Sequence, residues 1–256
     1  MTTVAELENV TKIYRVRGQG VHHVAVDNVS FSVDAGETLG IVGESGSGKT
    51  TVARMLLRLT RPTSGRLAIK GIDIWAADRQ TRKQLPRAVQ VVFQDPYASL
   101  DPRMTVGASI AEGAKRIFGR PQATRDLGRL LDIVGLPQRY RNLYPRELSG
   151  GQRQRVAIAR ALAMQPAVLV ADEPVSALDV SMQGQVLNLL NDLRAELQLT
   201  CVFISHDLGI VRQFCERVLV MEHGKVVEEG LPEEIFNAPA HPYTKSLIDA
   251  LPRMSW

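Results

Sequence analysis

Alternating apolar and polar residues predict two half-buried strands near the start of the chain, at residues 4–14 and 24–33. The segment between them, residues 15–23, carries glycines and basic residues and is predicted to be a loop. Two continuous apolar runs, Thr38–Val42 and residues 167–171, are instead typical of strands covered on both faces in a parallel sheet. The chain is therefore expected to combine an antiparallel and a parallel β portion.

The middle of the chain has a different pattern. From residue 95 to about residue 166 the β-branched runs disappear, and apolar residues recur at helical spacing, as at Leu127, Leu130 and Leu131. This change predicts a helical subdomain inserted into an α/β core. Further helices are predicted at residues 51–57, 153–164, 179–198, 232–236 and 243–250. Further strands are predicted at residues 66–69, 72–74, 88–93, 201–204, 218–221 and 226–228, of which the last two are expected at a sheet edge.

The composition is that of an ordinary globular protein. Hydrophobic residues make up 45% of the 256 residues, and no apolar run approaches the roughly 18 residues of a membrane-spanning helix. The first residues show no signal peptide, so a cytoplasmic protein is expected. The net charge of +4, without a dense block of Lys and Arg, gives no indication of nucleic-acid binding. Cys201 and Cys215, expected in a strand and a helix, lack metal-site spacing and are predicted to be buried free thiols.

One stretch between a predicted strand and a predicted helix carries recognisable chemistry. It fits the phosphate-loop pattern G-x-x-x-x-G-K-[ST] and comprises Gly43, Glu44, Ser45, Gly46, Ser47, Gly48, Lys49 and Thr50, followed by Thr51. The glycines let backbone amides approach an anion, Lys49 supplies a cation for the outer phosphates, and the Thr50 hydroxyl can bind Mg²⁺. The helix N-terminus favours negative charge as well. The alternative is an ordinary glycine turn, which the strand–loop–helix context disfavours.

Polar residues also follow other predicted strands. Asp172 and Glu173 end an apolar run, at the strand end where open α/β sheets bind ligands. Asp172 can hold Mg²⁺ through water, and Glu173 can orient or deprotonate an attacking water. The alternative for this pair is a solvated acidic turn. His206 also follows a strand and is expected on the same rim, although a lone histidine is more often structural. Tyr14 either packs on the core or stacks on a purine base.

A second glycine-containing loop, formed by Leu148, Ser149, Gly150, Gly151 and Gln152, precedes a predicted helix. Ser149 and Gln152 fit a capping box, with serine as the N-cap and glutamine at the third helical position. The capping box does not explain two consecutive glycines, which cost helix stability and are expected where a ligand approaches the backbone. This loop is therefore a second candidate anion site.

Together these motifs resemble the ATP-binding cassette (ABC) ATPases over essentially the whole chain, in the motif order of that family. The resemblance implies an α/β fold of the P-loop NTPase class, of the ABC type, with an antiparallel β portion and an inserted helical subdomain. It implies one domain over residues 1–256. Within that domain it places the nucleotide-binding core at 1–94 and 167–230, the helical subdomain at 95–166 and a C-terminal tail at 231–256.

The same resemblance implies a role for each motif. Residues 43–50 correspond to the Walker A loop, residues 168–172 to the Walker B strand and residues 176–179 to the D-loop. Leu148 to Gln152 resemble the signature loop, which encloses the nucleotide of a second cassette. Glu173, His206, Lys49 and Gln94 are the catalytic residues that the resemblance implies. It implies that ATP contacts Tyr14, residues 43–51, Leu148, Ser149, Gly150, Gly151, Gln152 and Asp179, and that Mg²⁺ contacts Thr50, Gln94 and Asp172.

Two finer features, residues 93–102 and the tail motif His241-Pro242-Tyr243-Thr244, resemble the ATPases of oligopeptide, dipeptide and nickel importers. This subfamily implies two transmembrane permease subunits, a second related ATPase in a heterodimer rather than a homodimer, and an indirectly associated substrate-binding protein. It also implies a peripheral position on the cytoplasmic side of the membrane and no nucleic-acid partner. Some relatives carry a cysteine-rich tail with an iron–sulfur cluster. No cysteine follows Cys215, so no cluster is expected here.

The motifs leave the cargo open among peptides, nickel, other metal chelates and glutathione. An alternative function is that of a soluble ABC ATPase acting on ribosomes, DNA or cluster assembly. The second cassette of translation factors and the coiled-coil or zinc insertions of DNA-repair members are not visible in the sequence. A third reading, a nucleotide-binding regulator without turnover, conflicts with the presence of Glu173 and His206.

Overall fold

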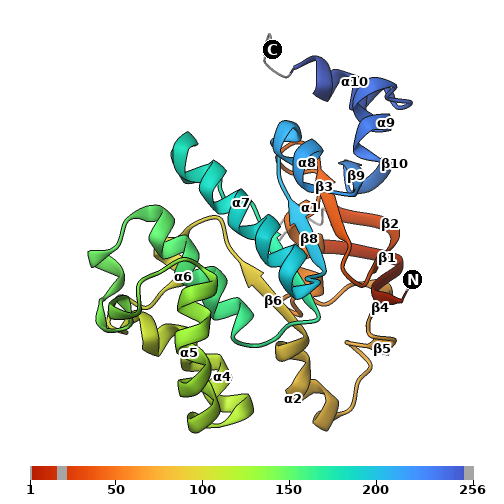
Figure 1. Cartoon of the computed structure of the whole chain (residues 1–256). Coiled ribbons are helices and arrows are strands. Elements are labelled where there is room, and N and C mark those ends of the chain that lie inside the picture. Colours follow the sequence, from red (N-terminus) through yellow and green to blue (C-terminus); the bar gives the residue numbers. More distant parts are fainter. Residues whose placement is uncertain (1, 16–21, 251–256) are drawn as a thin grey trace. The chain divides into compact units, whose positions relative to one another are not determined.

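The computed structural model describes residues 2–15 and 22–250, without the side chains of residues 82–84, 120 and 124. Figure 1 shows the chain as a ribbon coloured along the sequence. The chain divides into two compact units. Unit 1 comprises residues 1–82 and 200–256, and unit 2 comprises residues 83–199. Each unit is described by itself below.

Unit 1 contains an antiparallel sheet and a mostly parallel sheet. The antiparallel sheet has the strand order β2-β1-β4-β5, formed by β1 (Thr3–Arg15), β2 (His22–Asp34), β4 (Ser64–Ile69) and β5 (Ile72–Asp73). In the second sheet β3 lies between β8 and β9 and is parallel to both, and β10 pairs antiparallel with β9. These strands are β3 (Thr38–Val42), β8 (Cys201–Ile204), β9 (Arg217–Glu222) and β10 (Lys225–Gly230).

A glycine allows close packing of a helix on the central strand β3. A Cβ atom at Gly40 would lie 2.8 Å from Val211 Cγ1 and 2.9 Å from Cys215 Sγ, which is closer than real contacts permit. Val211 belongs to α8 (Leu208–Phe214), and Cys215 follows it directly. The other helices of unit 1 are α1 (Lys49–Leu56), α9 (Pro232–Asn237) and α10 (Pro242–Asp249). Cys201 and Cys215 are both buried and form no disulfide, as predicted.

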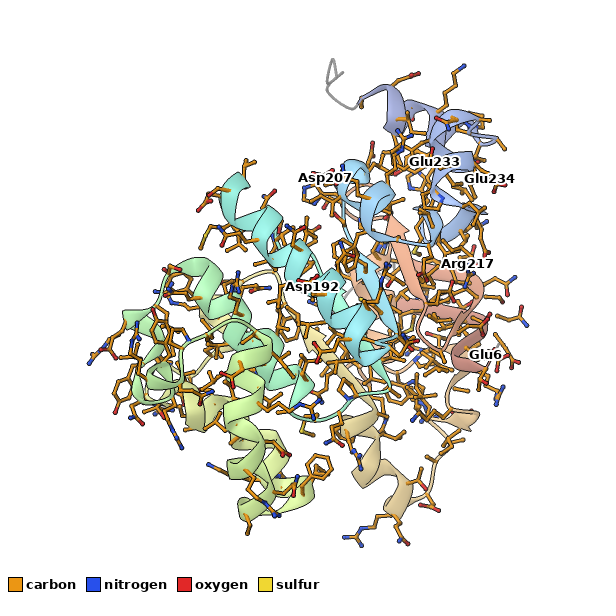
Figure 2. The ribbon with its side chains drawn as sticks, viewed as in Figure 1. Glu6, Asp192, Asp207, Arg217, Glu233 and Glu234 are labelled. Carbon is orange, nitrogen blue, oxygen red and sulfur yellow. The ribbon has the colours of Figure 1, made fainter. Side chains whose placement is uncertain are left out.

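One partly buried arginine connects several strands of unit 1. Arg217, on β9 (Figure 2), donates from Nε to Glu37 Oε1 at 2.7 Å and also hydrogen-bonds Glu229 on β10 and the Ser32 carbonyl on β2. Burial works against the charged guanidinium, but the bonds and charges of Glu37 and Glu229 outweigh it and raise the pKa of Arg217. The arginine therefore joins the two sheets of this unit through charged hydrogen bonds.

Unit 2 places helices around two parallel strands, β6 (Val89–Val92) and β7 (Val168–Asp172). Its central helix is α6 (Gly150–Leu162), whose buried residues include Val156 and Ile158. They belong to an apolar core that also includes Ile110 and Leu131. The remaining elements are α3 (Pro96–Ser99), α4 (Val106–Phe118), α5 (Arg120–Ile133), the 3₁₀ helices η1 (Gln138–Asn142) and η2 (Pro145–Glu147), and α7 (Val180–Leu197). Helix α2 (Arg79–Ala88) spans the boundary between the units.

The structure confirms the α/β class and most of the predicted elements, and it corrects four details. Arg15, His22 and His23, predicted to be in a loop, lie in strands, because β1 and β2 pair up to Arg15 and His22. Strand β9 is not at an edge, since it pairs with both β3 and β10. Helix α2 was not predicted, and Cys215 lies just after a helix rather than in it. Residues 16–21 of the predicted loop and 251–256 of the tail lie outside the described residues.

The division of one domain into a core, a helical subdomain and a tail remains a prediction. Within residues 2–15 and 22–250, no helix is both long and apolar enough to cross a bilayer.

Candidate active site

The predicted phosphate loop of unit 1 connects β3 to α1 and adopts a conformation that requires glycine at two points. Gly43 has φ 148° and Gly48 has φ 109°. A Cβ atom at Gly43 would lie 2.2 Å from the Met221 carbonyl oxygen, and one at Gly48 would lie 2.5 Å from the Ala25 carbonyl oxygen. Both collisions involve backbone atoms of neighbouring strands, which cannot move aside cheaply. The two glycines therefore let the loop pack directly against β2 and β9.

Lys49 is enclosed by the loop that it follows. Its side chain is buried, with a relative exposure of 6%. The ammonium donates to the carbonyl oxygens of Gly43 at 2.6 Å and Glu44 at 2.8 Å, and to Ser47 Oγ at 3.4 Å. These oxygens compensate for the loss of hydration, since a buried charge needs partners. The loop thus fixes a positive charge at its centre, where it can attract an anion.

The start of α1 has the properties of an anion site. Its N-cap is Gly48, which offers no side chain to cap the first amides of the helix. A Cβ atom at Gly46 would have no neighbour within 4 Å, so the backbone there faces open space. Thr50, in the first turn, is exposed and can present its hydroxyl. This part of the loop therefore fits a phosphate chain with its bound cation.

The other predicted residues of unit 1 lie on or directly after strands of this unit. Tyr14 is half-buried on β1 opposite His23, two residues from the Ala25 carbonyl that abuts the loop. The Lys12 ammonium lies 4.9 Å from the centre of its ring. His206 is exposed between β8 and α8, and the flanking Asp207 caps that helix (Figure 2).

In unit 2, the parallel pairing brings Gln94 and the two carboxylates to the same edge. Val92 of β6 is in register with Ala171 of β7. Gln94 lies two residues after Val92, and Asp172 and Glu173 directly follow Ala171. Gln94 is exposed, while both carboxylate residues are partly buried. The structure therefore places these three residues at neighbouring carboxyl ends of parallel strands.

Glu173 has an unusual backbone conformation, with φ 50°, in the left-handed region that side chains disfavour. Its carbonyl accepts hydrogen bonds from the amide of Ser176 at 3.3 Å and from the Ser176 hydroxyl at 3.2 Å. These bonds stabilise the strained turn that follows β7. Such strain is often found at functional positions.

Gln154 on α6 was not identified from the sequence. Its side chain hydrogen-bonds the backbone next to two predicted site residues, Gln94 and Glu173. Its Nε2 donates to the Phe93 carbonyl at 3.3 Å and to the Pro174 carbonyl at 2.7 Å. Phe93 directly precedes Gln94, and Pro174 directly follows Glu173. The side chain is fully buried. The only available signal, a polar residue on a helix face otherwise filled by apolar residues, does not identify its partners.

The loop before α6 has the predicted capping box. Ser149 Oγ accepts from the Gln152 amide at 3.3 Å, and Gln152 Oε1 accepts from the Ser149 amide at 2.9 Å. A Cβ atom at Gly150 would touch only Leu178 Cδ2, at an ordinary 3.4 Å, whereas one at Gly151 would collide with Met182 Cε at 2.3 Å. Met182 Cε is the end of a flexible side chain that can move aside, so packing within the chain requires glycine at neither position. Leu148 is buried beneath the loop.

Asp179 has a structural role that is visible within the chain. It caps α7, accepting hydrogen bonds from the Ser181 hydroxyl at 2.7 Å and the Met182 amide at 2.9 Å. These bonds lower the pKa of the Asp179 carboxyl, with the Ser181 hydroxyl contributing most. The cap fixes the loop that runs from Ser176 to this helix.

Comparison with known proteins shows the family to which this chain belongs. The profile of the family "ABC transporter" matches residues 26–176, and that of "Oligopeptide/dipeptide transporter, C-terminal region" matches residues 227–255. The oligopeptide transport ATP-binding protein OppF of Bacillus subtilis is 49% identical over 89% of this chain and 76% of its own length. The di/tripeptide transport ATP-binding protein DppF of Pseudomonas aeruginosa is 46% identical over 98% of this chain and 80% of its own length.

Solved structures agree in fold. The ATP-binding cassette MJ0796, in a dimeric post-hydrolysis state bound to ADP and Pi, has a TM-score of 0.77 and 33% identity, covering 89% of this chain and 98% of that one. CbiO1 of Clostridium perfringens, part of the transporter complex CbiONQ, has a TM-score of 0.81 and 28% identity, covering 93% and 92%. The motifs, the fold and both profiles agree, and the chain belongs to the ABC transporter family as an ATP-binding cassette of the ATPase type.

Proposed function

We propose that this chain is the ATP-hydrolysing subunit that energises an importer of oligopeptides, dipeptides or a related cargo such as nickel. The observation that carries the proposal is the combination, in one chain, of an anion-binding loop around Lys49 and a C-terminal segment of the oligopeptide/dipeptide transporter type. The two named relatives, which act in oligopeptide and di/tripeptide transport, support the same cargo class.

The phosphate loop supplies the binding chemistry. Lys49 and the amides at the start of α1 hold the phosphates of ATP, and the ring of Tyr14 stacks on the adenine. The described part of the chain contains no group of three or more His, Cys, Asp or Glu side chains that could hold a metal by themselves. Mg²⁺ usually binds through one or two carboxylates together with substrate phosphates, and Asp172 is one such carboxylate. Thr50, Gln94 and Asp172 would hold it there, where it neutralises phosphate charge.

Hydrolysis needs positioning and charge stabilisation more than covalent chemistry. In this proposal Glu173 orients the attacking water and accepts its proton, while Gln94 and His206 contact the reacting phosphate from their own strand ends. Ser149 and the Gly150 amide act on a nucleotide held by a second cassette, together with the neighbouring residues of the signature loop. Asp179, the cap of α7, belongs to the loop that adjoins this shared site.

The proposed partners follow from this mechanism. Two permease subunits span the membrane, and a related second ATPase completes the nucleotide sandwich as a heterodimer. A substrate-binding protein delivers the cargo, and this chain binds peripherally on the cytoplasmic side. We propose no iron–sulfur cluster on these 256 residues, because such clusters use about four cysteine ligands and only two cysteines are present.

Two substitutions test the assignment of the active site. We expect Glu173→Gln to bind ATP normally and to lose nearly all hydrolysis, because the neutral amide cannot accept the proton of water.

We expect Lys49→Ala to weaken ATP binding, since the loop loses its buried cation. Both are measured by nucleotide titration and by phosphate release in the assembled transporter. Near-normal turnover in Glu173→Gln would remove Glu173 from catalysis, and undiminished affinity in Lys49→Ala would contradict the phosphate-loop assignment.

A further inference from the structure

The tail motif of residues 241–244 forms the beginning of α10 and gives each residue a defined place. His241 is the N-cap, and its Nδ1 accepts from the Tyr243 amide at 3.2 Å. Pro242 occupies the first turn, where its missing N–H costs nothing. Thr244 is fully buried. The motif therefore fixes where α10 starts and in which direction the Tyr243 side chain leaves it.

A carboxylate on β10 anchors the same helix start. Glu228 accepts from the Ala240 amide with Oε1 at 2.8 Å and from the His241 amide with Oε2 at 3.0 Å. Burial opposes ionisation of Glu228, but the nearby Thr244 side chain and the hydrogen bonds from these two amides outweigh it and lower the pKa of the carboxyl. Two charged hydrogen bonds to one carboxylate hold the backbone of the tail firmly against β10.

From this anchored position, Tyr243 reaches the phosphate loop. Its phenol oxygen accepts a hydrogen bond from the Glu44 amide at 2.9 Å. That amide belongs to the peptide group between Gly43 and Glu44, whose carbonyl oxygen accepts from Lys49 Nζ at 2.6 Å. One peptide group is thus held from both sides, by the tail through its N–H and by Lys49 through its oxygen.

We propose that Tyr243 is a positioning residue for the phosphate loop, acting through the Gly43–Glu44 peptide to hold the Lys49 ammonium where phosphates bind. Glycine at position 43 leaves this peptide free to rotate in the absence of a restraint. Rotation would remove one of the oxygens that hold Lys49. The two hydrogen bonds also polarise each other across the amide, so losing one weakens the other. The inference builds on the proposed ATP site and assigns the tail motif a task within it.

The ionisation state of the phenol is compatible with this contact. Partial burial raises the pKa of Tyr243 and outweighs the hydrogen bond from the Glu44 amide, which lowers it, while the nearby carboxylates of Glu44 and Glu222 raise it further. The phenol therefore stays protonated and uncharged near neutral pH, and its oxygen accepts from the Glu44 amide without placing a negative charge beside the phosphates.

The test removes only the phenol oxygen, in Tyr243→Phe of the full chain. We expect the Glu44 amide to exchange its hydrogen with solvent faster in the absence of nucleotide, and ATP to bind about threefold to tenfold more weakly, in line with one lost hydrogen bond. The kcat of the assembled transporter at saturating ATP should stay close to that of the unmodified chain, because the loop is then held by the ligand. The change therefore appears in KM rather than in kcat.

Matched variants separate positioning from a general loss of structure. Tyr97→Phe removes a phenol oxygen from unit 2 and should leave exchange and affinity unchanged. His241→Ala should reproduce the effect of Tyr243→Phe, because the helix start loses its cap, and His241→Asn should restore binding, because asparagine is a good N-cap.

Unchanged exchange at Glu44 in Tyr243→Phe would overturn the contact, and unchanged ATP affinity would overturn its consequence. Absence of ATP binding by the unmodified chain would instead contradict the proposed function, while the exchange measurement without nucleotide would still decide on the tail contact.

Discussion

At the scale of single residues, the buried Gln154 side chain has a position that the sequence does not reveal. Its two amide hydrogens are used by the Phe93 and Pro174 carbonyls, which flank Gln94 and Glu173. Its Oε1 is buried without a hydrogen-bond partner among the described residues. Nothing else in the described contacts of this side chain requires an amide. Its NH₂ group therefore serves to hold the two strand ends at which the proposed catalytic residues lie.

We expect Gln154→Met to lower kcat by about tenfold while ATP affinity stays unchanged, because two hydrogen bonds that orient the catalytic edge are lost but the phosphate loop is intact. Methionine keeps the length of the side chain, and steady-state kinetics with a separate ATP titration measure both quantities. Gln122→Met, which removes a hydrogen bond to Asp126 on α5, is the control and should change neither. A Gln154→Met variant with normal kcat would show that the bridge is only structural.

The sequence identified residues whose functional role is indicated by a local sequence motif. Lys49, Asp172 and Glu173 were found because a fixed spacing of glycine, lysine or carboxylate follows an apolar strand. Gln154 and Tyr243 were not assigned a task. Gln154 has partners 61 and 20 residues away in the chain, and the partner of Tyr243 lies 199 residues away. No local pattern records such a pairing.

At the scale of elements, α6 begins with two glycines that differ in what they permit. Alanine at Gly151 would require the flexible Met182 side chain to shift, whereas alanine at Gly150 would make an ordinary contact with Leu178. Fold stability alone would therefore favour alanine at position 150, where glycine costs up to about 1 kcal/mol in a helix. We propose that glycine at this position allows a phosphate group to approach the backbone closely.

We expect Gly150→Ala to raise the free energy of unfolding by about 0.5 kcal/mol and to reduce ATP hydrolysis in the assembled transporter by more than about tenfold, because the methyl group excludes the phosphate. Denaturant titration and phosphate release measure the two effects. Gly184→Ala is the matched control. It lies within α7, where a Cβ atom would meet nothing within 4 Å, so it should stabilise without loss of activity. Full activity of Gly150→Ala would remove the ligand explanation.

Strands β3 and β8 were predicted from their apolar runs, and helix α6 from its pattern and its capping box. The placement of an element was wrong where it depends on pairing with a strand far away in the chain. Strand β9 was predicted at an edge because its short apolar run resembles an edge strand, yet it pairs in parallel with β3, which lies far earlier in the chain. Helix α2 was missed because it is polar and contains Pro86, although Asp78 accepts a hydrogen bond from the Thr81 amide at its start.

At the scale of the whole molecule, the proposed mechanism needs two cassettes, since the phosphate loop and the signature loop act on nucleotides held in different subunits. If the second ATPase is a different chain, the Glu173→Gln variant alone should remain a 28.2 kDa monomer with ATP and Mg²⁺. Adding the second ATPase should then produce a heterodimer, because slow hydrolysis preserves the closed state. Light scattering after gel filtration measures the mass. An ATP-dependent homodimer of this chain alone would contradict the heterodimer.

The burial of the two thiols has a practical consequence for following this protein in time. Cys201 and Cys215 are 3% and 8% exposed, both lie in unit 1, and the chain has no other cysteine. A thiol-specific reagent therefore reacts only when the unit that carries the phosphate loop opens, and it does not report on motions confined to unit 2. The rate at which this reagent labels the unmodified chain therefore measures how often unit 1 opens.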